Sequence, residues 1–115
     1  MLEPIDMSAL RLSATAHLFQ GADAGSGVSM FIVRTPPGKF VELHVHPYTE
    51  TFLLLEGHGR WTAGEESVEM VDEGMLVVPP ETKHGFRNVG EVPLLVVSVH
   101  ESPTLQQTFL DEEPA

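Results

Sequence analysis

Three histidines and one glutamate are spaced in a way that suits a divalent metal ion. His44 and His46 are two residues apart within the run GKFVELHVHPYTETFLLLEG, which covers residues 38–57. On a β-strand this spacing places both imidazoles on one face. Glu50 follows after a short turn, and His84 comes much later in the chain. Imidazole nitrogens together with a carboxylate form a mixed site that suits iron, manganese, nickel, cobalt, copper or zinc.

The sequence around these residues reads as a series of short strands separated by turn residues. Apolar runs of four to eight residues each end at glycine, proline or acidic turns, a pattern typical of an all-β barrel or sandwich. The intervals leave no room for crossover helices, so the strands are expected to pair antiparallel. The expected strands are residues 28–35, 40–46, 51–56, 60–63, 67–71, 75–78, 85–89 and 94–100.

The charge of the chain argues against several kinds of partner. The sequence has 17 acidic and 6 basic residues among 115, which gives a formal net charge of −11. Binding to nucleic acid or to an anionic membrane requires a stripe of lysine or arginine, and this composition cannot supply one. The sequence has no cysteine, so disulfides and thiolate metal ligands are excluded. We therefore expect no nucleic-acid partner and no membrane partner.

Length and hydrophobic content fit a single domain. Hydrophobic residues make up 42% of the chain, enough for one core. We expect an N-terminal segment over residues 1–27, which could add a strand or contact a second subunit. A barrel over residues 28–100 and a C-terminal tail over residues 101–115 would follow. The N-terminus lacks the basic and apolar regions of a secretory signal, and no stretch reaches the length of a membrane span, so the expected location is cytoplasmic.

The run from Gly38 to Gly57 resembles the first signature of the cupin family. Its two end glycines, its two histidines and its glutamate all keep the spacing of that signature. In cupins, the residues that match these positions and the later histidine coordinate one metal ion inside a barrel of two antiparallel sheets. The resemblance therefore implies a jelly-roll barrel, an antiparallel double-stranded β-helix, with one divalent metal ion bound by His44, His46, Glu50 and His84.

The second cupin signature is matched only in part. Pro79, His84 and Asn88 fall in its register, whereas Glu73 and Glu81 stand where the family has glycine. Glycine serves turns that need a positive φ angle, so these departures concern the shape of two loops and leave the ligand His84 unchanged. The resemblance covers about residues 28–100, which is most of the chain.

Strand alternation indicates which side chains share the face of the proposed ligands. Residues two apart on a strand point the same way, although a β-bulge would reverse the assignment. His100 ends the last expected strand, where it could act as a general base at the mouth of the site or simply lie at the surface. For the others the alternative is ordinary core packing. The candidate pocket residues are Phe40, Glu42, Phe52, Leu54, Phe86 and His100.

Several functions agree with such a site. Four protein ligands leave an octahedral ion with about two open positions, where a substrate or O2 could bind. We favour a metal-dependent enzyme acting on a small organic substrate, a dioxygenase with Glu50 as candidate proton acceptor. Cupins with matching sites also include isomerases, lyases and cyclases, because the fold does not fix the reaction. The alternative is a non-catalytic protein that uses the metal to bind a small molecule.

A homodimer is the expected assembly. Small cupins are commonly dimeric, so the resemblance implies a second copy of the chain as a partner. An exposed edge strand or residues 105–110 of the tail would supply the contact between the two copies.

Overall fold

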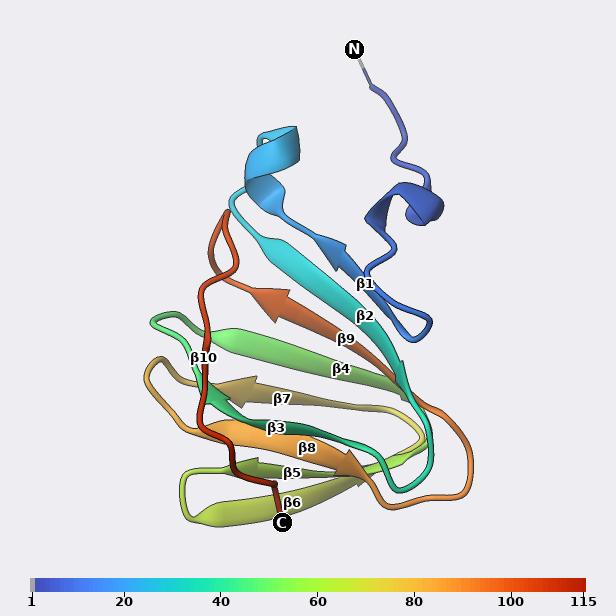
Figure 1. Ribbon diagram of the computed structural model, residues 1–115, viewed down its shortest axis with the longest axis vertical. Helices are drawn as coiled ribbons and strands as arrows, with labels where there is room; N and C mark the ends of the chain where they lie inside the picture. Colours follow the sequence, from blue (N-terminus) through green and yellow to red (C-terminus); the bar gives the residue numbers. More distant parts are fainter. Residues whose placement is uncertain (1) are drawn as a thin grey trace.

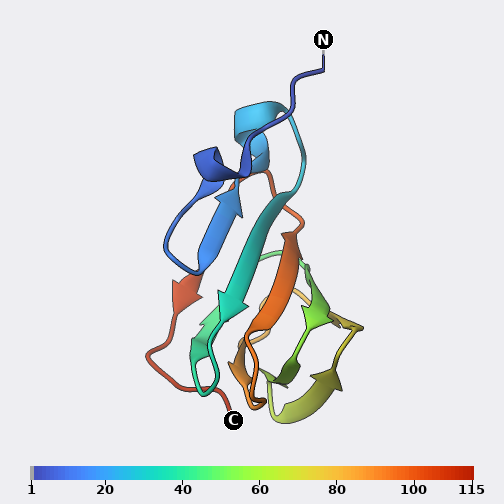
Figure 2. The ribbon, with the colours of Figure 1, turned by 90° about the vertical axis from the view of Figure 1, so that its right-hand side faces the viewer.

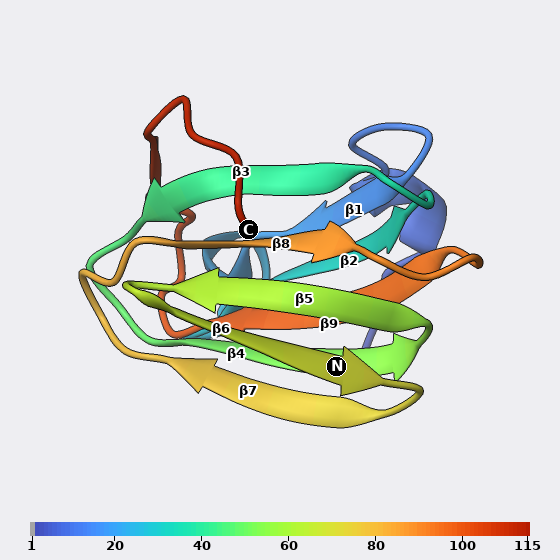
Figure 3. The ribbon, with the colours of Figure 1, turned by 90° about the horizontal axis from the view of Figure 1, so that it is seen from below.

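Two antiparallel sheets face each other in the computed structural model, which describes residues 2–115 (Figures 1 and 3). The first sheet has the strand order β1-β2-β9-β4-β7, and the second has the order β10-β3-β8-β5-β6. The strands are β1 (Ala16–Phe19), β2 (Ser29–Thr35), β3 (Phe40–Val45), β4 (Glu50–Glu56), β5 (His58–Ala63), β6 (Glu66–Val71), β7 (Gly74–Val78), β8 (His84–Asn88), β9 (Leu94–His100) and β10 (Thr108–Phe109).

The eight strands expected from the sequence are all present, and their bounds differ from the expected ones by no more than two residues. The prediction of an all-β, antiparallel jelly-roll barrel is confirmed. Two further strands come from the ends of the chain. β1 pairs with β2 at the edge of the first sheet, and β10 pairs with β3 at the edge of the second. Both the N-terminal segment and the C-terminal tail are therefore attached to the barrel.

Only two short helical turns accompany the strands in residues 2–115. Both are 3-10 turns of four residues, η1 (Met7–Leu10) and η2 (Gly21–Ala24). Figure 2 shows them at the end of the molecule where the N-terminus lies. Neither is long and apolar enough to cross a membrane.

An apolar core joins the two sheets beside the polar ligands. Trp61 and Phe86 of the second sheet stack with their ring centroids 5.3 Å apart, and Phe52 of the first sheet meets both rings edge-on. Burying each such side chain stabilises the fold by roughly 2 kcal/mol. The core holds the sheets together while the inward face of β4 changes from Leu54 in the core to Glu50 at the site.

Turn residues with positive φ angles shape the loops that carry the ligands. Gly38 and Gly57 have φ angles of 79° and 105°, which explains the glycines at both ends of the first signature. Glu81, which replaces a glycine of the second signature, adopts a φ of 58° itself. This conformation costs a non-glycine residue about 1 kcal/mol. The backbone N–H of Glu81 donates to the carbonyl oxygen of His46 at 2.9 Å, which fastens the loop before His84 to the other ligands.

Candidate metal centre

The four proposed ligands converge between the two sheets. His44 lies on β3, Glu50 on β4 and His84 on β8, and His46 directly follows β3. Each side chain offers one nitrogen or oxygen atom, and these atoms all lie within 4.8 Å of one another. All four residues are buried. Because bonds from a metal to imidazole nitrogen are about 2.1 Å long, ligand atoms around one ion lie roughly 3 to 4 Å apart. The spacing therefore fits a single metal ion.

The backbone determines which nitrogen of each imidazole faces the site. Nδ1 of the three histidines lies 2.7 to 3.1 Å from a backbone carbonyl oxygen. A carbonyl oxygen can only accept, so Nδ1 carries the hydrogen and Nε2 of the neutral ring keeps its lone pair. This tautomer is the one that binds a metal through Nε2. The three donor and acceptor pairs are His44 with Glu42, His46 with Tyr48, and His84 with Thr82.

The contacts of Glu50 require a cation. Its Oε1 lies 2.7 Å from Nε2 of His46 and 2.9 Å from Nε2 of His84. In the neutral tautomer described above, these contacts bring lone pairs against lone pairs. A proton or a metal ion between the atoms removes the repulsion, and a buried carboxylate is costly without such compensation. The donor set thus has the chemistry of a divalent metal site.

Burial and hydrogen bonding hold two of the ligands in their metal-binding forms. Desolvation lowers the pKa of His44 to about 4, so its ring is neutral near pH 7. Burial alone would raise the pKa of Glu50, but hydrogen bonding, to which His100 contributes most, outweighs that effect and lowers it. A neutral imidazole and an ionised carboxylate are the forms that bind metal.

His100 is buried beside the ligands instead of lying at the surface. It is 1% exposed, and its Nε2 lies 3.1 Å from Oε2 of Glu50. Its Nδ1 lies 2.7 Å from Oη of Tyr48, which accepts a hydrogen bond from the backbone N–H of Gln106 at 3.3 Å. Because Oη of Tyr48 accepts that bond, its own hydrogen is available to donate to Nδ1 of His100. Nε2–H of His100 then donates to Glu50.

Sequence reasoning missed this role of Tyr48 and His100. The sequence did indicate that His100 is an even number of residues away from the inward-facing residues of the last strand, so that its side chain points the same way. That signal becomes decisive only with the register between β9 and β4, in which His100 stands opposite Glu50.

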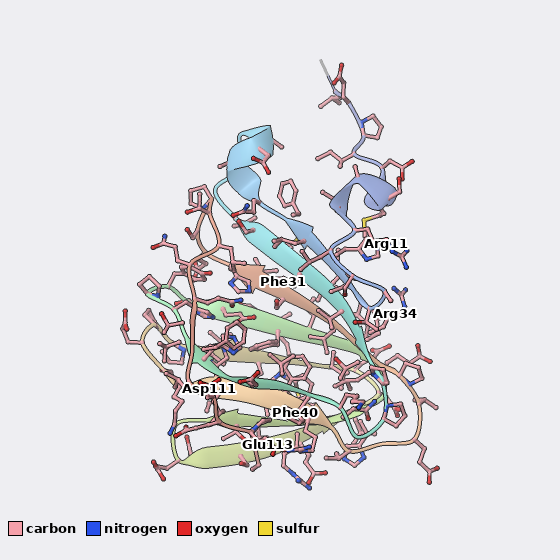
Figure 4. The ribbon with its side chains drawn as sticks, viewed as in Figure 1. Arg11, Phe31, Arg34, Phe40, Asp111 and Glu113 are labelled. Atoms are coloured by element: carbon pink, nitrogen blue, oxygen red, sulfur yellow. The ribbon has the colours of Figure 1, made fainter. Side chains whose placement is uncertain are left out.

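A cavity of about 470 Å³ borders the site, and His44, Glu50 and His100 line its wall. Most of the remaining wall is apolar. Phe31 and Phe40, labelled in Figure 4, come from different sheets and both line the cavity. The C-terminal tail closes the wall near the ligands, where the ring centroid of Phe109 lies 5.2 Å from that of His44. The expected pocket residues that line the cavity are Phe40, Phe52, Phe86 and His100.

The other two candidate pocket residues do not line the cavity. The register between β3 and β8 shifts between Val41 and His44, so Val41 lines the cavity and Glu42 does not. This is the change of parity that a β-bulge produces. Leu54 points to the same side of β4 as Glu50, but it lies four residues further along the strand, where it belongs to the hydrophobic core.

Comparison with solved structures supports the fold. The barrel superposes on oxalate decarboxylase from Bacillus subtilis, a protein with Mn(II) centres, with a TM-score of 0.77 at 19% sequence identity. The superposition covers 86% of this chain and 29% of that chain. At this level of identity, the similarity establishes the fold alone.

Curated relatives are more similar in sequence. An uncharacterized protein from Methanocaldococcus jannaschii is 36% identical over 70 residues, which are 59% of this chain and 55% of that protein. Protein SchB from Streptomyces halstedii is 33% identical over 100 residues, which cover 80% of this chain and 62% of SchB. The chain therefore spans less than two thirds of the length of either relative. The family model described as the cupin domain matches residues 31–100, more than half of the sequence, and the chain belongs to the cupin family.

Proposed function

We propose that this chain is a metal-dependent enzyme acting on a small organic substrate. The observation that carries the proposal is that His44 and Glu50 both belong to the ligand cluster and line the cavity. A metal ion that only stabilised the fold would normally be enclosed by protein ligands. Here the ion would face a space large enough for an organic molecule. When bound, the metal supplies Lewis-acid or redox chemistry at that boundary.

The residues around the ligands prepare the site for this role. His46 and His84 direct Nε2 at the site because their Nδ1 atoms are held by the backbone. His100 holds the second oxygen of Glu50. Because its pKa is lowered, Glu50 is a weak proton acceptor, so we assign it the role of ligand in preference to general base.

The side chains that line the cavity indicate which class of substrate it could bind. Oxalate, the substrate in the name of the Bacillus subtilis neighbour, is a small dianion that needs a polar site. The wall here is mainly aromatic and aliphatic, which favours a larger and less polar molecule. Manganese, iron, cobalt and nickel suit four ligands with open positions better than zinc does. We propose a dioxygenase with one of these metals, and an isomerase, lyase or cyclase as the alternative reactions.

Metal-loaded protein supplied with catechols, enols and diketones tests the proposal. Oxygen uptake and product formation are followed in air, and product formation is followed again without oxygen. Oxygen-dependent conversion that is lost in His84→Gln and kept in His58→Gln supports a dioxygenase. Conversion without oxygen supports an isomerase, lyase or cyclase. Binding of these compounds with no conversion of any of them favours the non-catalytic binding protein.

We also propose that two copies pair through the outer face of the first sheet. Leu55 of β4 and Met75 and Val77 of β7 are 49%, 64% and 58% exposed. They alternate with the inward residues of their strands, so all three lie on the outer face. An apolar face of this kind is typical of a symmetric interface. The tail is a weaker candidate for the contact, because its residues 108–109 pair with β3 of the same chain.

A further inference from the structure

The cavity extends along β2 far beyond the metal ligands. Near the site, Glu50 and Ser29 both pair in register with His100. Thr35 lies six residues beyond Ser29 on β2 and lines the cavity, as does His100. Six residues of strand span about 20 Å. A molecule that fills the cavity therefore has one end at the metal and the other end near Thr35.

Thr35 carries an unused hydrogen-bonding group at the far end. The residue is 5% exposed, and its Oγ1 has no hydrogen-bond partner within residues 2–115. Its backbone is fixed, because its carbonyl oxygen accepts from Nδ2 of Asn88 at 2.8 Å. Buried hydroxyl groups are normally hydrogen-bonded. Rotation about the Cα–Cβ bond turns this hydroxyl towards the cavity that Thr35 lines, where a bound molecule would be its partner.

Lys39 lines the same end of the cavity, on the other side of the turn at residues 36–38. Its ammonium forms no ion pair with residues of the described chain. By contrast, the charged groups of Arg60, Lys83 and Arg87 are all paired with glutamates. An unpaired ammonium and an unpaired hydroxyl that line the same end of a cavity are groups that can bind a carboxylate.

Arg11 and Arg34 are the other basic residues of the part described that form no ion pair. Arg34 directly precedes Thr35, and Arg11 forms a β-bridge with His17 of β1. Figure 4 shows Arg11 and Arg34 on one side of the molecule. Arg34 and Thr35 are neighbours on β2, so their side chains point to opposite faces, and Arg34 acts on an anion in the cavity only through its long-range field.

From this geometry we infer that the cavity binds an organic acid with an apolar body, whose carboxylate contacts Thr35 and Lys39 and whose opposite end faces the metal. The inference rests on the proposed function, because it names the class of substrate for the same site. Thr35 and Lys39 would then determine specificity without touching the metal.

Nickel-loaded protein, titrated without oxygen, provides the test. The probes are ω-(3,4-dihydroxyphenyl)alkanoic acids of increasing chain length, each compared with its primary amide. The catechol supplies metal donors, and the amide matches the acid in size without its charge. At the chain length that reaches Thr35, calorimetry should show the acid binding about tenfold more tightly than the amide, the strength of a charge-assisted hydrogen bond.

Variants assign that preference to the two residues. Lys39→Gln and Thr35→Val should each bring the ratio of the two dissociation constants towards one. Thr35→Ser, which keeps the hydroxyl, and Arg60→Gln, which removes a charge elsewhere, should preserve it. Equal binding of acids and amides at every chain length, or an unchanged preference in both of the first two variants, overturns the inference while the proposed function stands. If neither series binds to the metal-loaded protein, the inference is overturned, and the conversion of enols and diketones decides the proposed function separately.

Discussion

Nε2 of His100 lies 3.1 Å from Oε2 of Glu50, on the side of the carboxylate opposite to His46 and His84. The two oxygens of Glu50 thus have separate partners. Tyr48 orients His100 by its hydrogen bond to Nδ1. The carboxylate is therefore held in one rotational position, with Oε1 left among the metal ligands.

Replacement of His100 by glutamine should weaken metal binding. Loss of the hydrogen bond lets the carboxylate rotate, and changes of this kind typically reduce metal affinity by about tenfold or more. Competition with a chelating indicator measures the affinity, and the absorption spectrum of cobalt-loaded protein reports the ligand geometry. His58→Gln, at an exposed histidine paired with Glu69, serves as the control. Unchanged affinity and an unchanged cobalt spectrum in His100→Gln would show that His100 does not position Glu50.

Removal of the metal should lower the melting temperature. Metal at about 100 times its dissociation constant adds about 2.7 kcal/mol to the free energy of unfolding. For a domain of this length, that corresponds to roughly 10 °C in Tm. A chelator should therefore lower the Tm of wild-type protein and leave the Tm of His84→Gln unchanged. A wild-type Tm that does not respond to the chelator contradicts metal binding by the folded state.

Acidification should destabilise the metal-free protein. The pKa of His44 is lowered from 6.5 to about 4 by burial, so between these values the unfolded chain binds more protons than the folded one. The contribution of His44 to the free energy of unfolding is complete above pH 6.5 and is lost as the pH falls towards 4. Between pH 7 and pH 5.5 the expected loss is about 1 kcal/mol. Urea unfolding at both pH values should show a smaller loss in His44→Asn, and an equal loss in the two proteins refutes the assignment.

Disruption of the apolar outer face should produce monomers. Met75→Glu places a charge on the exposed face of β7, where it would be buried between two copies. Sedimentation velocity should show a dimer for wild-type protein and a monomer for the variant. Lys39→Glu, a charge change on a different surface, should leave the dimer intact. A wild-type protein that sediments as a monomer at tens of micromolar excludes this assembly.

Much of the fold was readable from the sequence because strands and turns have local signatures. The bounds of β9 agree at both ends with the expected strand 94–100. The ligand cluster was equally accessible, because the spacing of His44, His46 and Glu50 matches the first cupin signature and the resemblance adds His84.

Other features depend on pairing between distant segments. The register shift after Val41 moves Glu42 off the cavity wall, and no local pattern marks it. The role of His100 depends on its register opposite Glu50. The contribution of Phe109 depends on the tail returning to pair with β3. These are tertiary relationships, which alternation within one strand cannot reveal.

Elemental analysis of protein purified without chelators or a metal-binding tag, beside the variants His84→Gln and His58→Gln, tests whether His44, His46, Glu50 and His84 bind one metal ion. We predict about one equivalent of a divalent transition metal in wild-type protein and in His58→Gln, and its loss in His84→Gln. Absence of metal from wild-type protein, even after incubation with each candidate ion, or full retention in His84→Gln, would contradict the account.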